Sequence, residues 1–196
     1  LENDGAKALQ YTTTEGYKPL REWIAHRMNS RLVTSFDCDH ILITHGSQQA
    51  LDLSGKLFLD EGDVVLCESP TYLAAISAFK AYGCTFAEVP TDEEGMVISE
   101  LTAILEKQPN AKFIYVIPDF QNPSGRTWSL ERRKQLAELS ARFDIPVIED
   151  NPYGELRFEG EFLPSVKSFD GVDNVICTGT FSKIFCPGYR IGWIAG

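Results

Sequence analysis

The sequence predicts a three-layer α/β/α fold built around a mainly parallel sheet. Short apolar segments alternate with longer amphipathic segments along nearly all of the 196 residues. The short segments are apolar at consecutive positions, which is typical of strands buried on both faces. Helical segments join them, and strands joined by helical crossovers pair in parallel with helices on each face. We therefore expect one sizeable α/β domain.

Seven segments have the composition of buried strands. Most are rich in Val, Ile, Leu or Phe, and Gly, Pro, Asp or Asn residues separate them from the neighbouring segments. The predicted strands are 40–44, 63–67, 84–89, 112–117, 146–149, 174–177 and 192–195. They predict a seven-stranded sheet.

The segments between these strands have helical periodicity. In the segment 19–28, Leu20, Trp23, Ile24 and Arg27 recur at the spacing of helical turns. A glycine and a serine after the first strand open the next helix. The predicted helices are 19–28, 46–59, 71–82, 99–106 and 130–143.

Composition excludes several classes of protein. The chain has 18 basic and 28 acidic residues and a net charge of −10, which argues against nonspecific nucleic-acid binding by this domain. No apolar run approaches the roughly 18–20 residues of a membrane span. The five cysteines include no C-x-x-C pair and the three histidines lack metal-ligand spacing, so we expect reduced thiols and no metal. A cytoplasmic protein is expected.

The segment TFSKIFCPGYRIG, residues 180–192, carries the strongest chemical signal. Lys183 lies between the hydroxyl residues Thr180 and Ser182, just after a predicted strand, and Arg190 follows a Pro-Gly turn. Ligand sites in open α/β sheets lie at the carboxyl ends of the strands. An amine can form a Schiff base with an aldehyde cofactor, while hydroxyls and a guanidinium can hold a phosphate. The same string could also be a surface loop with two ordinary charges.

Three further strand ends carry polar or aromatic groups. After the first strand, Gly46, Ser47 and Gln48 expose backbone N–H groups at a helix start, where an anion can bind, although Ser47 could be a plain N-cap. After the second strand, the ring of Tyr72 could cover a flat ligand or belong to the core. After the strand 112–117, Asn122 precedes a proline, which favours an extended or turn geometry, although Asn-Pro-Ser-Gly is also a common turn composition.

The end of the strand 146–149 carries a carboxylate. Asp150 would be costly in a buried position unless it were paired, so we expect it to meet a cation or a protonated ring nitrogen. Tyr153 follows three residues later and supplies a phenol. The groups at these strand ends together match the phosphate, ring oxygen and ring nitrogen of pyridoxal phosphate.

Six ordered motifs carry a family resemblance over nearly the whole chain. They are LQYTTTEGYKPLRE, HGSQQALD, ESPTYLAA, PDFQNPSG, EDNPYGEL and TFSKIFCPGYRIGW. With them the sequence resembles the fold-type I pyridoxal-phosphate enzymes, in particular the class I/II aminotransferases and their branch of 2-aminoadipate and kynurenine aminotransferases. The resemblance implies a seven-stranded, mostly parallel sheet with one antiparallel strand.

The resemblance also implies a role for each site residue. Lys183 would form the Schiff base with the cofactor, Asp150 would keep the pyridine nitrogen protonated, Asn122 and Tyr153 would bind the ring oxygen, and Tyr72 would stack on the ring. The implied phosphate ligands are Ser47, Gln48, Thr180, Ser182, Arg190 and, from the partner subunit of a homodimer, Tyr11.

The expected domain is the large, cofactor-binding domain, residues 1–196. The family's amino-terminal arm and carboxyl-terminal small domain would then lie outside this stretch. The implied activity is amino-group transfer between an amino acid and a 2-keto acid through the Schiff base on Lys183. Two alternatives stay open: a pyridoxal-phosphate-dependent lyase, and the effector-binding domain of a GntR/MocR-type transcription regulator. The 196-residue piece could also be inactive by itself, since the residues that bind the substrate carboxylate lie elsewhere in the family.

Overall fold

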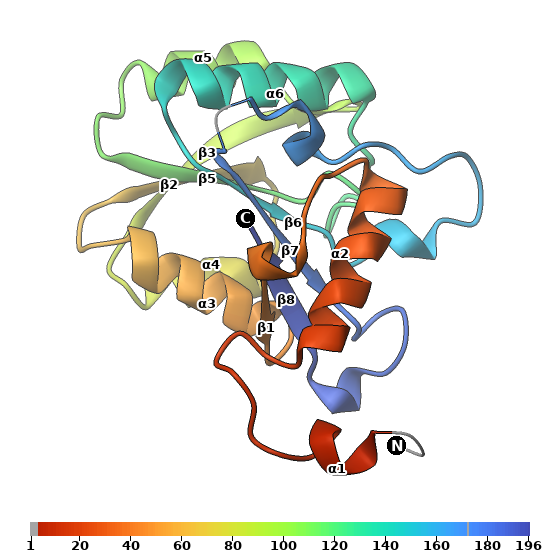
Figure 1. Ribbon diagram of the computed structural model, residues 1–196. Coiled ribbons are helices and arrows are strands. Elements are labelled where there is room, and N and C mark those ends of the chain that lie inside the picture. Colours follow the sequence, from red (N-terminus) through yellow and green to blue (C-terminus); the bar gives the residue numbers. More distant parts are fainter. Residues whose placement is uncertain (1–3, 172) are drawn as a thin grey trace.

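Eight strands form one mixed sheet in the computed structural model, which describes residues 4–171 and 173–196 (Figure 1). The strands are β1 (Ile41–Thr44), β2 (Val64–Ser69), β3 (Thr85–Asp92), β4 (Gly95–Met96), β5 (Ala111–Val116), β6 (Val147–Asp150), β7 (Val175–Thr180) and β8 (Gly192–Ala195). Their order across the sheet is β1-β8-β7-β6-β5-β2-β3-β4. Adjacent strands from β7 to β3 are parallel, whereas β8 is antiparallel to both β1 and β7. The expected three-layer, mostly parallel fold is confirmed.

The count of seven strands is one too low. The additional strand, β4, has two residues and pairs with the end of β3 in an antiparallel bridge, Thr91 with Met96 and Asp92 with Gly95. Two residues that include a glycine carry no periodic pattern, so the sequence offered no signal for this strand. It only extends the sheet edge and does not alter the order of the other seven.

The helices fill the connections between the strands. The α-helices are α1 (Gly5–Ala8), α2 (Lys18–Leu32), α3 (Ser47–Phe58), α4 (Leu73–Lys80), α5 (Ile98–Leu105) and α6 (Leu130–Phe143). Short 3₁₀ helices are η1 (Cys38–His40), η2 (Gly154–Leu156), η3 (Val166–Phe169) and η4 (Pro187–Tyr189). The Ser129 side chain accepts a hydrogen bond from the backbone N–H of Arg132 and caps α6. Within the described segments, no helix is both long and apolar enough to cross a membrane.

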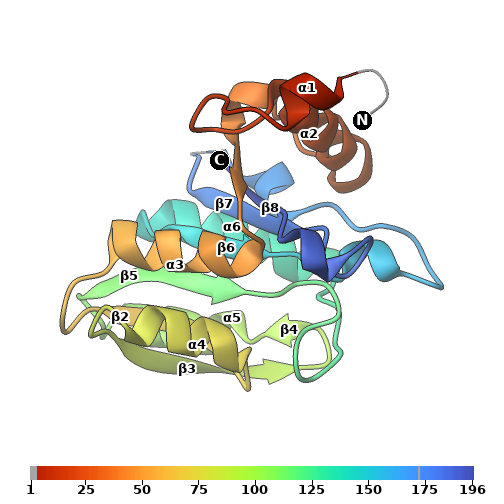
Figure 2. The ribbon, with the colours of Figure 1, turned by 90° about the horizontal axis from the view of Figure 1, so that it is seen from below.

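Helices cover both faces of the sheet. Figure 1 shows α5 and α6 on one face and α3 and α4 on the other. Figure 2 shows α2 over β7 and β8, at the end of the sheet away from β3. One buried cluster joins α2, α5 and α6 to the sheet through Ile24, Leu101 and Leu136. A second joins α3 and α4 to it through Leu51 and Phe79.

The second cluster anchors the strand that leads to the site. The ring of Phe79 meets Phe113 and Tyr115 on β5 edge to face, with centroids 5.0 and 5.6 Å apart. All three side chains are fully buried. Burial of one such ring stabilises the fold by about 1.5–3 kcal/mol, and edge-to-face pairs add roughly 0.5–1.5 kcal/mol each. β5 is therefore a rigid support for the loop that follows it.

The antiparallel strand β8 decides which loops meet at the carboxyl edge. β1 and β7 end at this edge, whereas β8 begins there because it runs in the opposite direction. Gly192, the first residue of β8, pairs with Thr44 at the end of β1 and with Thr180 at the end of β7. The segment before β8, which contains Arg190, is thereby brought beside the loops that follow β1 and β7.

Candidate active site

The amino terminus of α3 forms one wall of the site. Gly46 turns the chain from β1 into α3 with a φ of 77°, in the left-handed region that favours glycine. The first N–H groups of a helix have no partner within it, and the helix dipole adds positive potential there. Ser47 is half-buried at this end. This end of α3 can therefore accept a phosphate group.

Arg190 forms the opposite wall. Its Nη2 donates to the backbone carbonyl of His45 at 3.3 Å, and its Nη1 donates to that of Pro187 at 3.4 Å. A Cβ atom at Gly46 would lie 2.8 Å from Nη2 of Arg190. The guanidinium thus lies directly over the turn into α3, and a side chain at position 46 would collide with it.

The loop after β7 supplies the third wall. Thr180 is buried at the end of the strand, and its Oγ1 donates to Oγ of Ser182 at 2.9 Å. The same Oγ1 accepts the backbone N–H of Ser182 at 3.1 Å. The two hydroxyls are therefore held side by side, across Gly192 from the turn into α3.

Gln48 departs in part from its predicted role. The side-chain amide was expected to help hold the phosphate, but its Nε2 donates to the carbonyl of Ala74 at 3.0 Å and so ties α3 to α4. The backbone N–H of Gln48, in the first turn of α3, is the group that stays available for an anion.

Asp150 lies buried at the end of β6 with only 2% of its surface exposed. Its Oδ1 accepts the Thr178 hydroxyl at 2.7 Å and its Oδ2 accepts the Tyr115 hydroxyl at 2.9 Å. Burial raises the pKa of Asp150 to about 6, and these two donors oppose the rise. Of the two predicted partners, a cation or a protonated ring nitrogen, no cation forms an ion pair with Asp150 among the described residues, and both of its side-chain hydrogen-bond donors are neutral hydroxyls.

The other residues predicted to bind the ring lie close to Asp150 or to one another. Nδ2 of Asn122, after β5, lies 3.4 Å from the phenol oxygen of Tyr153, after β6. Burial raises the pKa of the Tyr72 phenol, and negative charge at Tyr153 and Asp150 raises it further. Tyr72 directly precedes α4, one residue before the helix rather than in its first turn as predicted. These four residues follow or end the three strands β2, β5 and β6, which are neighbours in the sheet.

A buried ion-pair network fixes the loops that carry Asn122 and Tyr153. Oδ1 and Oδ2 of Asp119 accept hydrogen bonds from Arg133, at 2.9 and 3.2 Å, and Oδ1 also accepts one from Arg157 at 3.1 Å. Asp119 is 2% exposed and Arg133 is fully buried. Removing one partner of such a network leaves uncompensated charge, which costs about 3–5 kcal/mol. The network therefore locks the loop after β5 against the loop after β6.

Lys183, the predicted covalent residue, and Tyr11, the predicted contact to a partner subunit, are both exposed to solvent. Lys183 is exposed in the turn after β7, close in sequence to the Thr180–Ser182 pair. Tyr11 is fully exposed in the segment between α1 and α2. The contact of Tyr11 with a partner subunit stays a prediction, because the structure contains a single chain.

Glu68 is a second buried carboxyl near the site. Its Oε2 accepts the backbone N–H of Ile117 at 3.0 Å, and its Oε1 accepts the indole N–H of Trp128 at 2.8 Å. Burial raises the pKa of Glu68 to about 7. The group therefore joins the ends of β2 and β5 and changes its charge near neutral pH.

Trp128 fluorescence is expected to report this titration. Below pH 7 the carboxyl is protonated and its bond to the indole is weaker, so emission should change with a midpoint near 7. Because the folded state binds the proton more tightly, stability should fall by about 3 kcal/mol between pH 4.5 and 7. Glu68→Gln and Trp128→Phe should each abolish the emission midpoint, whereas Trp23→Phe should keep it. A midpoint that survives Glu68→Gln would contradict the assignment.

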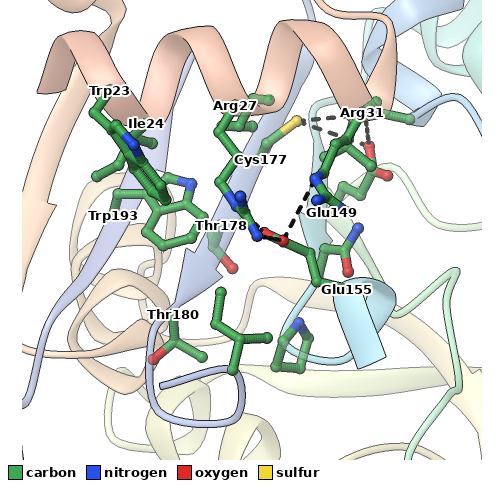
Figure 3. Close-up of a pocket in the computed structure, with 16 residues that line it drawn as sticks. Trp23, Ile24, Arg27, Arg31, Glu149, Glu155, Cys177, Thr178, Thr180 and Trp193 are labelled. Atoms are coloured by element: carbon green, nitrogen blue, oxygen red, sulfur yellow. Dashed lines mark hydrogen bonds and ion pairs between the residues drawn. The ribbon is translucent and has the colours of Figure 1, made fainter. Parts of the chain in front are cut away.

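A separate pocket lies beneath α2, and Figure 3 shows it. Trp23, Arg27 and Arg31 reach into it from α2, and both arginines form ion pairs with Glu155. Glu149 lines it, and side chains alternate along a strand, so Glu149 faces away from Asp150. This pocket includes Thr180 but lies mainly on the other face of the sheet from the residues described above.

Several residues that support the site were not predicted from the sequence. They are Tyr115 and Thr178, which hold Asp150, Gly192, which allows the close approach of α3, and the pair Asp119 and Arg133. The available signal was a polar residue inside an otherwise apolar strand, as at Tyr115 and Thr178. No local signal marks Gly192, because its contact is with a residue far away in sequence.

The arrangement of these groups around one edge of the sheet has counterparts among known proteins. The pattern of the family described as aminotransferase class I and II matches residues 2–196. The chain belongs to this family. In this class I and II aminotransferase-family chain, the motifs that carry Ser47, Asn122, Asp150 and Lys183 follow strands that end at one edge of the sheet.

Individual relatives agree. The chain is 49% identical to aromatic-amino-acid aminotransferase 1 of Thermococcus litoralis, covering 100% of this chain and 48% of the relative. The chain is also similar to the crystal structure of LysN, an α-aminoadipate aminotransferase from Thermus thermophilus, which is complexed with N-(5'-phosphopyridoxyl)-L-leucine. The TM-score is 0.90 and the sequence identity is 42%, and the match covers 100% of this chain and 49% of that one. The chain is also 37% identical to an uncharacterized HTH-type transcriptional regulator, YisV, of Bacillus subtilis, covering 99% of this chain and 40% of the relative. The chain therefore spans about half the length of the curated relatives it matches.

Proposed function

We propose that the whole protein is a pyridoxal 5'-phosphate-dependent aminotransferase that moves an amino group between an amino acid and a 2-keto acid. The observation that carries the proposal is that a buried carboxylate, Asp150, a helix end able to accept a phosphate and the exposed amine of Lys183 all follow strand ends at one edge of the sheet. When bound, the cofactor supplies an aldehyde that links to amines and a pyridinium ring that draws electrons from the substrate α-carbon.

The residues of the chain fit this cofactor. The guanidinium of Arg190 lies over Gly46 at the start of α3, which suits a phosphate dianion. Asp150, the last residue of β6, would accept an N–H from a ring nitrogen. Asn122 and Tyr153 would donate to the ring oxygen, and Tyr72 would cover the ring face.

Lys183 would have two tasks. Its Nζ would hold the cofactor covalently and, after a substrate amine displaces it, would take a proton from the substrate α-carbon and return one to the cofactor side. The carboxylate of Asp150 would keep the ring nitrogen protonated, and its buried, fixed position makes that charge effective.

Phosphate recognition by Arg190 can be tested separately. Arg190→Gln should weaken pyridoxal phosphate binding about 10- to 100-fold, because hydrogen bonds from a charged group contribute about 1.5–3 kcal/mol. Binding of pyridoxal, which has no phosphate, should change little. Arg142→Gln, at an exposed position on α6, is the matched control. Equal losses for both ligands in Arg190→Gln would contradict the phosphate role.

We also propose the assembly and location expected from the resemblance. The protein would be a homodimer in which Tyr11 of each chain reaches the phosphate held by its partner, and the full exposure of Tyr11 suits that role. Residues 1–196 would be its large domain, in keeping with the half-length match to relatives. All five cysteines are free, three of them buried, which suits a cytoplasmic protein.

The deciding experiment is an absorbance scan of the whole protein while candidate amino acids are added one at a time. Loss of the band of lysine-linked cofactor, with gain of the pyridoxamine phosphate band, identifies amino transfer and its donor. Carbon dioxide release or elimination without amine transfer would indicate the lyase alternative instead.

A regulator remains the second candidate, and one observation favours it. The similarity to the HTH-type regulator YisV spans 99% of this chain. A complete reading frame with a basic helix-turn-helix segment, and sequence-specific DNA binding that responds to pyridoxal phosphate, would decide for it. The net charge of −10 makes DNA contact by this domain itself unfavourable.

A further inference from the structure

Tyr115 is the buried partner of Asp150 that the proposed chemistry does not yet use. Its side chain is fully buried on β5, and Phe79 packs against its ring edge to face. Its hydroxyl donates to Oδ2 of Asp150 at 2.9 Å. The opposite oxygen, Oδ1, accepts the hydroxyl of Thr178 from β7 at 2.7 Å. The two strands that flank β6, namely β5 and β7, therefore each supply one hydrogen-bond donor to the carboxylate.

Each oxygen of Asp150 accepts one side-chain hydroxyl and keeps a lone pair for a further donor. A carboxylate offers about four lone-pair sites, and the two hydroxyls occupy one on each oxygen. Neither hydroxyl can neutralise the charge, since both are uncharged. In the described part of the chain, no lysine, arginine or histidine nitrogen forms an ion pair with Asp150. The carboxylate is thus fixed in direction, charged and still able to accept an N–H.

We propose that Tyr115 is a positioning residue that keeps Asp150 ionised and oriented to accept the ring N–H of the cofactor. This role rests on the proposed function, because it needs a ligand with a protonated ring nitrogen. Thr178 performs the same task at the other oxygen. Without these donors, a carboxyl this deeply buried takes up a proton and can no longer hold a positive ring nitrogen.

The neighbouring groups agree with this role. Burial raises the pKa of Tyr115 well above its usual range, so its hydroxyl stays a donor. The other titratable groups that face the pair are Tyr72, Tyr153 and, on the far side of Tyr115, Glu68. None of these can supply positive charge, so the hydroxyl donors are what stabilise the carboxylate.

The first test measures Asp150 directly in the whole protein without cofactor. Carboxyl ¹³C NMR should place the pKa of Asp150 near 6 in the wild type and at about 7–8 in Tyr115→Phe, because one charge-assisted hydrogen bond is lost. Thr178→Val should shift it in the same direction. The matched control is Tyr82→Phe, which deletes an exposed tyrosine hydroxyl that donates to Oδ1 of Asp52, also at 2.9 Å. An unchanged Asp150 pKa in folded Tyr115→Phe overturns the proposal.

The second test asks whether the effect acts through the ring nitrogen. At pH 7, Tyr115→Phe should bind pyridoxamine phosphate about two- to tenfold more weakly, because a smaller fraction of Asp150 is ionised. Binding of the 1-deaza analogue, which has a C–H in place of the ring nitrogen, should be equal in both proteins. Equal losses for both ligands would indicate a packing defect and overturn the proposal. Absence of pyridoxamine phosphate binding by the wild type would overturn the proposed function itself.

Discussion

Replacing Lys183 with alanine is expected to abolish the absorbance band near the visible edge that lysine-linked pyridoxal phosphate gives. Amino transfer by the whole protein should fall by at least about 10³-fold, because the variant loses both the covalent link and the group that moves the proton. The phosphate and ring contacts do not involve the lysine, so the cofactor should still bind reversibly. Absorbance spectra and keto-acid-dependent amine transfer measure the two effects.

The control for this variant is Lys80→Ala, at an exposed position in the last turn of α4. It should keep both the band and the activity. Retention of the band in Lys183→Ala would contradict the assignment of the covalent residue. A lost band with full activity would contradict the proton-transfer role alone.

Gly192→Ala is expected to break the phosphate site from a position that touches no ligand. A Cβ atom there would lie 2.5 Å from the carbonyl carbon of Gly46, 2.7 Å from the backbone N of Ser47 and 2.8 Å from the backbone O of Gly179. All three contacts are backbone atoms, so neither α3 nor β7 can yield by a change of side-chain rotamer. The start of α3 must move away from β8, and the N–H groups proposed to bind the phosphate would move with it.

We expect Gly192→Ala to lower the free energy of unfolding by about 3 kcal/mol and pyridoxamine phosphate affinity by more than tenfold. Urea denaturation and ligand titration measure these changes. Gly171→Ala is the matched control, because a Cβ there meets no atom within 4 Å and its φ is not in the left-handed region. If Gly192→Ala behaves like Gly171→Ala, the close approach of α3 to β8 is not needed for the site.

Lys183→Ala and Gly192→Ala distinguish the loss of a proposed reacting group from a change in the packing that positions the site. Lys183 acts at an exposed position, where its removal leaves the surrounding contacts in place. Gly192 acts through the distance between β8 and α3. Tyr115 combines both kinds of effect. It touches no predicted reacting atom, but its hydrogen bond controls the charge of Asp150.

Many of the helices and strands could be predicted from the sequence, because the local residue pattern of each element agrees with its structure. Helix α6 has the same bounds in the structure as in the prediction, 130–143, since Ser129 caps its start and its apolar periodicity lies within the segment. The strand ends were less certain: β7 continues to Thr180, three residues beyond its predicted end. Its last residues are small or polar, and their pairing with β8 keeps them in the sheet.

The sequence by itself determined the fold class and the inventory of the site, from the lysine and arginine of the segment 180–192 to the carboxylate at the end of β6. These residues are recognisable because each motif is local, a strand end followed by a turn. Only the tertiary structure decided the order of the strands, with β8 inserted between β1 and β7, and hence which loops meet. It also decided that the hydroxyls of Tyr115 and Thr178 hold Asp150, and that the Gln48 amide binds α4. Pairing between strands distant in sequence depends on long-range packing, which no local pattern encodes.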